Sequence, residues 1–151
     1  MIRGALLLGA TIAIVGTSTG TAPASPPKYG SFKTPSRNIV CGYSIDQHGK
    51  ASMECGIKSG LKPPPPRIHC DAGDPSDKRI GLTETGRARP VLCAGDPGPL
   101  LPQIEAKAVV LRYGTKIRIA GITCSSAITG LTCKNRSGHG FFMSRQSWRL
   151  F

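Results

Sequence analysis

Six cysteines constrain this chain more than any other feature of its sequence. They lie at Cys41, Cys55, Cys70, Cys93, Cys124 and Cys133. None belongs to a C-x-x-C pair or a Cys/His cluster of the kind that holds zinc, so the sequence predicts no metal site. An even number of cysteines in a short chain is instead typical of disulfide-bonded proteins from oxidising compartments. We therefore expect three disulfides.

The first 24 residues indicate how the chain reaches such a compartment. Arg3 supplies a positive charge, and residues 4–15 are an uninterrupted run of small and apolar side chains. The Ala-Pro-Ala of residues 22–24 places small residues where a signal peptidase requires them. The apolar run is shorter than the roughly 20 residues that cross a bilayer. The sequence thus predicts a signal peptide over 1–24, one secreted domain over 25–151, and no stable membrane span.

The rest of the chain has the pattern of an all-β domain built from short antiparallel hairpins. Its 19 Gly and 13 Pro divide it into short apolar runs, and long helical patterns are absent. An aliphatic residue or Met stands two positions before every cysteine, and residues two apart in a strand share a face. Each cysteine is therefore expected to face the core beside its apolar partner. These partners are Ile39, Met53, Ile68, Val91, Ile122 and Leu131.

Two segments narrow the fifteen pairings that six cysteines allow. Residues 39–55 and 122–133 each contain two short apolar runs around a turn, with a cysteine near each end. A Tyr-Gly pair precedes each segment, at Tyr29 and at Tyr113, which indicates a degenerate internal duplication. If each half carries a hairpin closed by its own disulfide, one pair remains. The predicted disulfides are Cys41–Cys55, Cys70–Cys93 and Cys124–Cys133.

The distribution of charge is the most informative surface feature. The chain has a formal net charge of +12. Residues 106–151 contain eight Lys and Arg and no acidic residue, whereas residues 25–105 contain all eight Asp and Glu. This asymmetry favours an anionic partner such as an envelope polymer or another polyanion. The alternation of charged and apolar residues predicts an outward-facing set of anion-binding side chains at Lys116, Arg118, Lys134 and Arg136.

The sequence favours a non-enzymatic binding or envelope-associated module, with two alternatives. His139, between two glycines, is a weak candidate for the catalytic base of a small nuclease-like hydrolase, but Gly-His-Gly is also typical of a tight turn. The loop from Lys58 to Arg67 is a candidate for the rigid loop of a protease inhibitor. It contains Pro63 to Pro66, which favour a stiff spacer. No cofactor is predicted, and aromatic residues, at 5%, are too few for a base-stacking platform.

Three stretches resemble a family of small secreted six-cysteine proteins of high-GC Gram-positive bacteria that is catalogued only as a domain of unknown function. They are residues 32–41 (FKTPSRNIVC), residues 93–96 (CAGD) and residues 138–145 (GHGFFMSR). The resemblance covers nearly all of residues 25–151 and implies the fold and an exported location, without an activity or catalytic residues. Members usually have glycine at the position of Arg37, so the turn there is expected to differ.

We expect export to remove residues 1–24. Mass spectrometry of protein secreted by a host with a functional signal peptidase should find a chain beginning at Ser25, within a few residues. A secreted chain that retains residues 4–15 would contradict this prediction.

Overall fold

The computed structural model describes residues 28–151, so the predicted signal peptide lies outside the described residues. In this part, the chain is mostly β-sheet, as the sequence predicts, with one short 3-10 helix and one short α-helix. The strands are β1 (Lys28–Lys33), β2 (Ile39–Ile45), β3 (Ala51–Ile57), β4 (Asp74–Pro75), β5 (Arg79–Thr83), β6 (Arg89–Pro90), β7 (Cys93–Ala94), β8 (Val109–Val110), β9 (Lys116–Ile119), β10 (Ile122–Ala127), β11 (Gly130–Asn135), β12 (Gly140–Met143) and β13 (Trp148–Leu150). The helices are η1 (Gly98–Leu100) and α1 (Pro102–Lys107).

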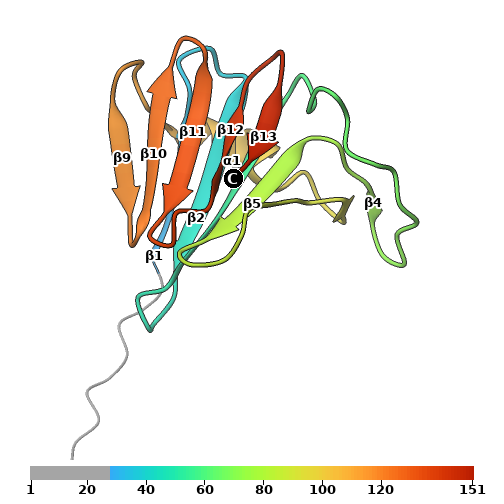
Figure 1. Cartoon of the computed structure of the whole chain (residues 1–151), viewed down its shortest axis with the longest axis horizontal. Helices are drawn as coiled ribbons and strands as arrows, with labels where there is room; N and C mark the ends of the chain where they lie inside the picture. The colour runs from blue at the N-terminus through green and yellow to red at the C-terminus, as the bar shows by residue number, and fades with distance from the viewer. Residues whose placement is uncertain (1–27) are drawn as a thin grey trace, which may run out of the picture.

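Two sheets pack face to face around one apolar core (Figure 1). The first sheet has the strand order β6-β5-β3-β2-β1-β8, and the second has the order β13-β12-β11-β10-β9. Strands β4 and β7 form a separate two-stranded ribbon. The core draws buried residues from both sheets, and Sγ of Cys124 in the second lies 3.7 Å from Sδ of Met53 in the first.

Both sheets are built around an antiparallel meander. The order β1-β2-β3-β5 in the first sheet corresponds to β9-β10-β11-β12 in the second. The predicted hairpins are β2–β3 and β10–β11, and in each of them the two cysteines face one another in register. The Tyr-Gly pairs do not correspond, because Tyr29 lies within β1 whereas Tyr113 lies in the turn before β9.

The structure contains the three disulfides that the sequence predicts. Two of them, Cys41–Cys55 and Cys124–Cys133, join directly opposed residues of neighbouring strands, with Cα atoms 4.0 Å apart. All four of these cysteines are fully buried. Each meander therefore has a disulfide at the centre of its core face.

The third disulfide, Cys70–Cys93, corrects the expectation that every cysteine faces the core. Both of its cysteines are half-buried, and Ile68 is 43% exposed. The rule that residues two apart share a face holds only in a strand. Ile68 and Cys70 lie in an irregular segment that follows four consecutive prolines, so the rule does not apply to them.

The turn between β1 and β2 shows why glycine suits the position of Arg37. Arg37 has a φ of 56°, in the left-handed region that glycine adopts without steric cost. Its N–H donates a hydrogen bond to the carbonyl of Thr34, and the N–H of Thr34 donates one to the carbonyl of Ile39. The neighbouring turn bonds hold Arg37 in this conformation.

Residues 94–108, which we call the covering segment, lie over the outer face of the first sheet. Leu100 lies against Gly56, where an added Cβ would be only 2.6 Å from Cγ of Leu100, so β3 requires glycine at this close approach. Lys33 Nζ and Ser31 Oγ donate hydrogen bonds to carbonyls of α1. The second sheet carries alternating exposed and buried residues, as expected of a sheet with one face in solvent.

Asn135 joins the two sheets through a buried amide. Its Nδ2 donates to the carbonyl of Thr83 at the end of β5, at 2.9 Å, and to that of Gly86 in the β5–β6 connection, at 2.7 Å. Its Oδ1 accepts from the backbone N–H groups of Ser137 and His139 in its own β11–β12 turn. One side chain thus fixes the conformation of this turn and its position against the first sheet.

Removing a core disulfide should cost more stability than removing the peripheral one. We expect Cys124→Ala/Cys133→Ala to lower the free energy of unfolding by about 4 kcal/mol, because it also leaves a cavity in the core. Cys70→Ala/Cys93→Ala should cost about 2 kcal/mol. Urea denaturation of the two double variants measures both values.

Loop-closure entropy alone predicts the opposite order, since the sequence separation is 9 for the core pair and 23 for the peripheral pair. A larger loss for Cys70→Ala/Cys93→Ala would therefore show that the entropy of the unfolded chain outweighs core packing.

Candidate functional site

The outer face of the second sheet carries four exposed cations. Strand alternation places Ile117 and Ile119 toward the core and Lys116 and Arg118 outward. The same alternation in β11 buries Leu131 and Cys133 and exposes Lys134. Arg149, in β13, is also exposed. We call this surface, formed by Lys116, Arg118, Lys134 and Arg149, the basic face.

The strand register fixes how these cations are arranged. Arg118 and Lys134 both lie opposite Thr123 of β10, so they occupy one row across the sheet with a single strand between them. Lys116 and Arg149 occupy the ends of the neighbouring row, which crosses all five strands through Ser125, Thr132 and Phe142. Cations in one row are separated by at least two strand spacings, about 10 Å.

Carboxylates are absent from the strands that form this surface. Residues 106–151 contain no Asp or Glu, and the basic-face residues take part in no ion pair within residues 28–151. Between the cations lie small hydroxyl side chains of β10 and β11, which add hydrogen-bonding capacity without charge. The surface therefore presents four cationic side chains with no carboxylate side chain among them.

Arg136, one of the four anion-binding side chains predicted from the sequence, does not belong to the basic face. It follows the last residue of β11, and its Nη2 lies 3.0 Å from Oε2 of Glu84. Glu84 comes from the first sheet's side of the molecule, and its side chain is 12% exposed. Arg136 therefore pairs with a carboxylate 52 residues away in the sequence, a contact that strand alternation does not reveal.

Arg149 takes its place, although the sequence-based prediction omits it. Its guanidinium carbon lies 5.1 Å from the centroid of the Phe142 ring on the adjacent strand. A cation over an aromatic ring is stabilised by about 0.5–1 kcal/mol at an exposed site and stays charged and accessible. The alternation of charged and apolar residues could have predicted this position, since Arg149 lies between Trp148 and Leu150 as Arg118 lies between two isoleucines.

His139 lies in the β11–β12 turn and is half-buried. Its backbone carbonyl accepts from the N–H of Asn135, and its own N–H donates to Oδ1 of Asn135. The imidazole forms no hydrogen bond or ion pair with any residue from 28 to 151. The backbone of His139 serves the turn, and the geometry assembles no acid–base pair around its side chain. Nor do the described residues contain a cluster of three or more metal-ligating side chains.

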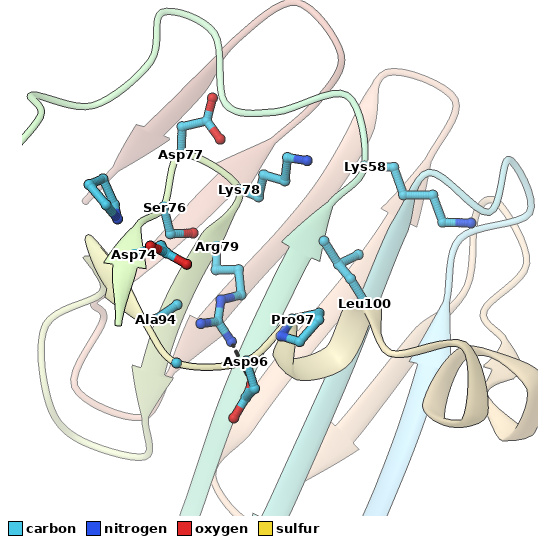
Figure 2. A pocket seen from close by; sticks show the side chains of 12 residues that line it. Lys58, Asp74, Ser76, Asp77, Lys78, Arg79, Ala94, Asp96, Pro97 and Leu100 are labelled. Carbon is cyan, nitrogen blue, oxygen red and sulfur yellow. Dashed lines mark hydrogen bonds and ion pairs between the residues drawn. The ribbon is translucent and has the colours of Figure 1, made fainter. Parts of the chain in front are cut away.

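A pocket of about 560 Å³ lies on the first sheet's side, between β4 and the start of the covering segment (Figure 2). Both signs of charge line it, from Lys58, Asp74, Asp77, Lys78, Arg79 and Asp96. The best-ordered charge is Arg79, which is only 6% exposed. Its Nη1 lies 2.7 Å from Oε1 of Glu54 and 3.4 Å from Oδ1 of Asp96.

These charges hold the covering segment in place. Asp96 also accepts a 2.6 Å hydrogen bond from the N–H of Gly98. Gly98 has a φ of 55°, and a Cβ there would collide with the Arg79 guanidinium. Burial raises the pKa of Glu54 above its ordinary value, and the positive charge of Arg79 opposes this only in part. The ion cluster of Arg79, Glu54 and Asp96 therefore has a structural role, because it holds the covering segment against the first sheet.

Together these features define a small disulfide-bonded β-protein of two packed sheets with one open, cationic outer face. Three disulfides in a domain of this size are typical of extracellular proteins. A sequence model of a protein family, described as Family of unknown function (DUF6636), matches residues 10–151, and the chain belongs to this family. No curated protein and no solved structure matches the chain. Among the described residues, no helix is both long and apolar enough to span a membrane.

Replacing Arg79 tests its role in holding the covering segment. Arg79→Leu should lower the free energy of unfolding by about 3 kcal/mol at pH 7.5, because a partly buried carboxylate loses its counter-charge. The pKa of Glu54 then rises further, so lowering the pH protonates this carboxyl and removes part of the penalty. The loss measured by urea denaturation should therefore be smaller at pH 4 than at pH 7.5.

Arg89→Leu is the matched control, since Arg89 is exposed on the adjacent strand β6 and forms no ion pair within residues 28–151. It should change the stability by less than about 0.5 kcal/mol at either pH. An Arg79→Leu loss that is equal at both pH values would show that Glu54 does not respond to Arg79.

Proposed function

We propose that this protein is an exported, non-catalytic binding module whose basic face holds an anionic polymer of the cell envelope or a similar polyanion. One observation carries the proposal. Four exposed cations share the outer face of the second sheet, and no carboxylate lies in the strands that form it. An uncompensated field of one sign attracts polyanions and accelerates their association.

The spacing of the cations favours a polymer over a small anion. Lys116 and Arg118 lie two residues apart on one strand, about 7 Å, and cations in one row are about 10 Å or more apart. A single phosphate or carboxylate can bridge a neighbouring pair such as Lys116 and Arg118 by direct hydrogen bonds of about 3 Å, but it cannot reach Arg149, four strand spacings from Lys116, as well. A chain with repeated negative charges can contact several of these cations at once.

The small side chains of β10 and β11 support the same class of partner. The basic face is the outer side of a five-stranded sheet, and these two strands carry Thr and Ser between the cations, while Phe142 of β12 lies beside Arg149. A sheet face with small side chains between cations gives access to an extended chain from either direction. Hydroxyl groups can then donate to phosphate or carboxylate oxygens between the charged contacts.

The alternative of a hydrolase centred on His139 has less support. A general base needs a partner that orients it and a substrate position within hydrogen-bond reach. The imidazole of His139 has no such partner in the described part of the chain, and its backbone is occupied by the Asn135 turn. No observation favours this function over binding.

Charge reversal on β9 tests the proposal. Binding to inorganic polyphosphate, measured by isothermal titration calorimetry, should weaken about 50-fold between 50 and 200 mM salt if each of four cations releases about 0.7 of a counterion, as on a single-stranded polyanion. Lys116→Glu/Arg118→Glu should abolish most of this affinity and make the salt dependence much shallower. Its melting temperature should stay close to that of the parent, because both side chains are exposed.

Lys50→Glu/Lys78→Glu is the matched control, since it changes the net charge equally at exposed positions outside the second sheet. It should retain most of the affinity. Equal losses in the two double variants would show that overall charge, rather than the basic face, attracts the polymer. Repeating the titration with polygalacturonate then compares carboxylate with phosphate polymers.

A further inference from the structure

An exposed segment between β3 and β4 has features that the basic face does not explain. It follows the four prolines of residues 63–66 and ends at Cys70. Arg67 is exposed, Ile68 is 43% exposed, and the side chain of His69 is 91% exposed. The three side chains between the prolines and Cys70 are therefore all accessible to a partner.

The backbone of this segment is unpaired. No backbone–backbone hydrogen bond joins Arg67, Ile68 or His69 to another residue within 28–151. These residues belong to no strand or helix. Their N–H and C=O groups are therefore available to a partner that reads an extended chain by adding it to one of its own strands.

Both ends of the segment are held in place. On one side, Nε1 of Trp148 donates a 2.7 Å hydrogen bond to the carbonyl of Pro63, and Pro65 is buried. On the other, Cys70 is covalently joined to Cys93. Consecutive prolines add further restriction, because each ring fixes φ. The loop therefore loses little conformational entropy on binding, which is the main benefit of a preorganised ligand.

We propose that residues 66–69 form a protease-binding loop, and that Arg67 enters the primary specificity pocket of a trypsin-like serine endopeptidase. The carboxylate at the base of that pocket selects an Arg or Lys side chain, and Arg67 is the one such residue among these four. The unpaired backbone of residues 67–69 supplies the strand-like contacts, whereas the prolines before Arg67 have no N–H to donate. A rigid loop of this kind occupies the active site as a competitive inhibitor.

A domain that recognises polyproline is the other class of partner that this loop could suit. Such a domain would contact residues 63–66 and would depend little on Arg67. Pro65 is buried, which removes part of the polyproline surface from contact. The structure therefore favours recognition of Arg67 over recognition of the prolines.

The experiment uses the oxidised full-length secreted protein and pancreatic trypsin whose catalytic serine is replaced by alanine, so that cleavage cannot occur. Calorimetry should show saturable 1:1 binding that benzamidine, a ligand of the specificity pocket, displaces. Arg67→Ala should weaken binding at least 100-fold, and Arg67→Lys should restore most of it. Trp148→Phe, which removes the indole N–H that holds Pro63, should weaken binding about five-fold.

Arg87→Ala is the matched control, since Arg87 is exposed in the β5–β6 turn, and it should bind like the parent. With active trypsin, the parent should inhibit hydrolysis of a chromogenic arginyl amide. Absence of binding, binding that survives Arg67→Ala, or rapid cleavage after Arg67 without inhibition would each overturn the proposal. Because Arg67 lies outside the second sheet, Lys116→Glu/Arg118→Glu should leave trypsin binding unchanged whatever its effect on polyphosphate.

Discussion

The relative position of the two sheets depends on the hydrogen bonds of one buried amide. Asn135 is 4% exposed, and both its donor hydrogens and its acceptor oxygen are satisfied by backbone groups. An unsatisfied amide at this depth would cost about 1–3 kcal/mol, so other arrangements of the sheets that break these bonds are disfavoured. The same bonds set the β11–β12 turn and bring Arg136 within reach of Glu84. Apolar contacts in the core constrain the relative position of the sheets less, because the hydrophobic effect is not directional whereas these hydrogen bonds are.

The two meanders have similar cores and different outer faces, and this difference locates the proposed site. Residues 94–108 cover the first sheet and hold the ion cluster of Arg79 beneath them. The corresponding face of the second sheet has no such cover, and its cations project into solvent. The acidic residues reinforce the contrast, since Glu54, Glu84 and Asp96 are each paired with an arginine. Three acidic side chains thus pair with arginines around the first sheet, whereas the four cations of the basic face form no ion pair within residues 28–151.

Local patterns in the sequence predicted the parts of the structure that local geometry determines. The two hairpins, their disulfides and the outward direction of Lys116, Arg118 and Lys134 follow from alternation within single strands. The prediction for Ile68 and Cys70 was wrong because prolines prevent a strand there. The pairing of Arg136 with Glu84 and the packing of Leu100 on Gly56 join residues far apart in the chain, so no periodicity in the sequence could indicate them.

The positions of the two core disulfides also affect how the native cysteine pairs form when the chain folds and is oxidised. Each lies within a single hairpin, with sequence separations of 14 and 9, so its cysteines approach as soon as that hairpin forms. Short loops of this kind close with little entropic cost. Once both hairpins are oxidised, Cys70 and Cys93 are the last free thiols, and fifteen possible pairings have been reduced to one. This arrangement favours the native disulfides, because each core pair can form within its own hairpin.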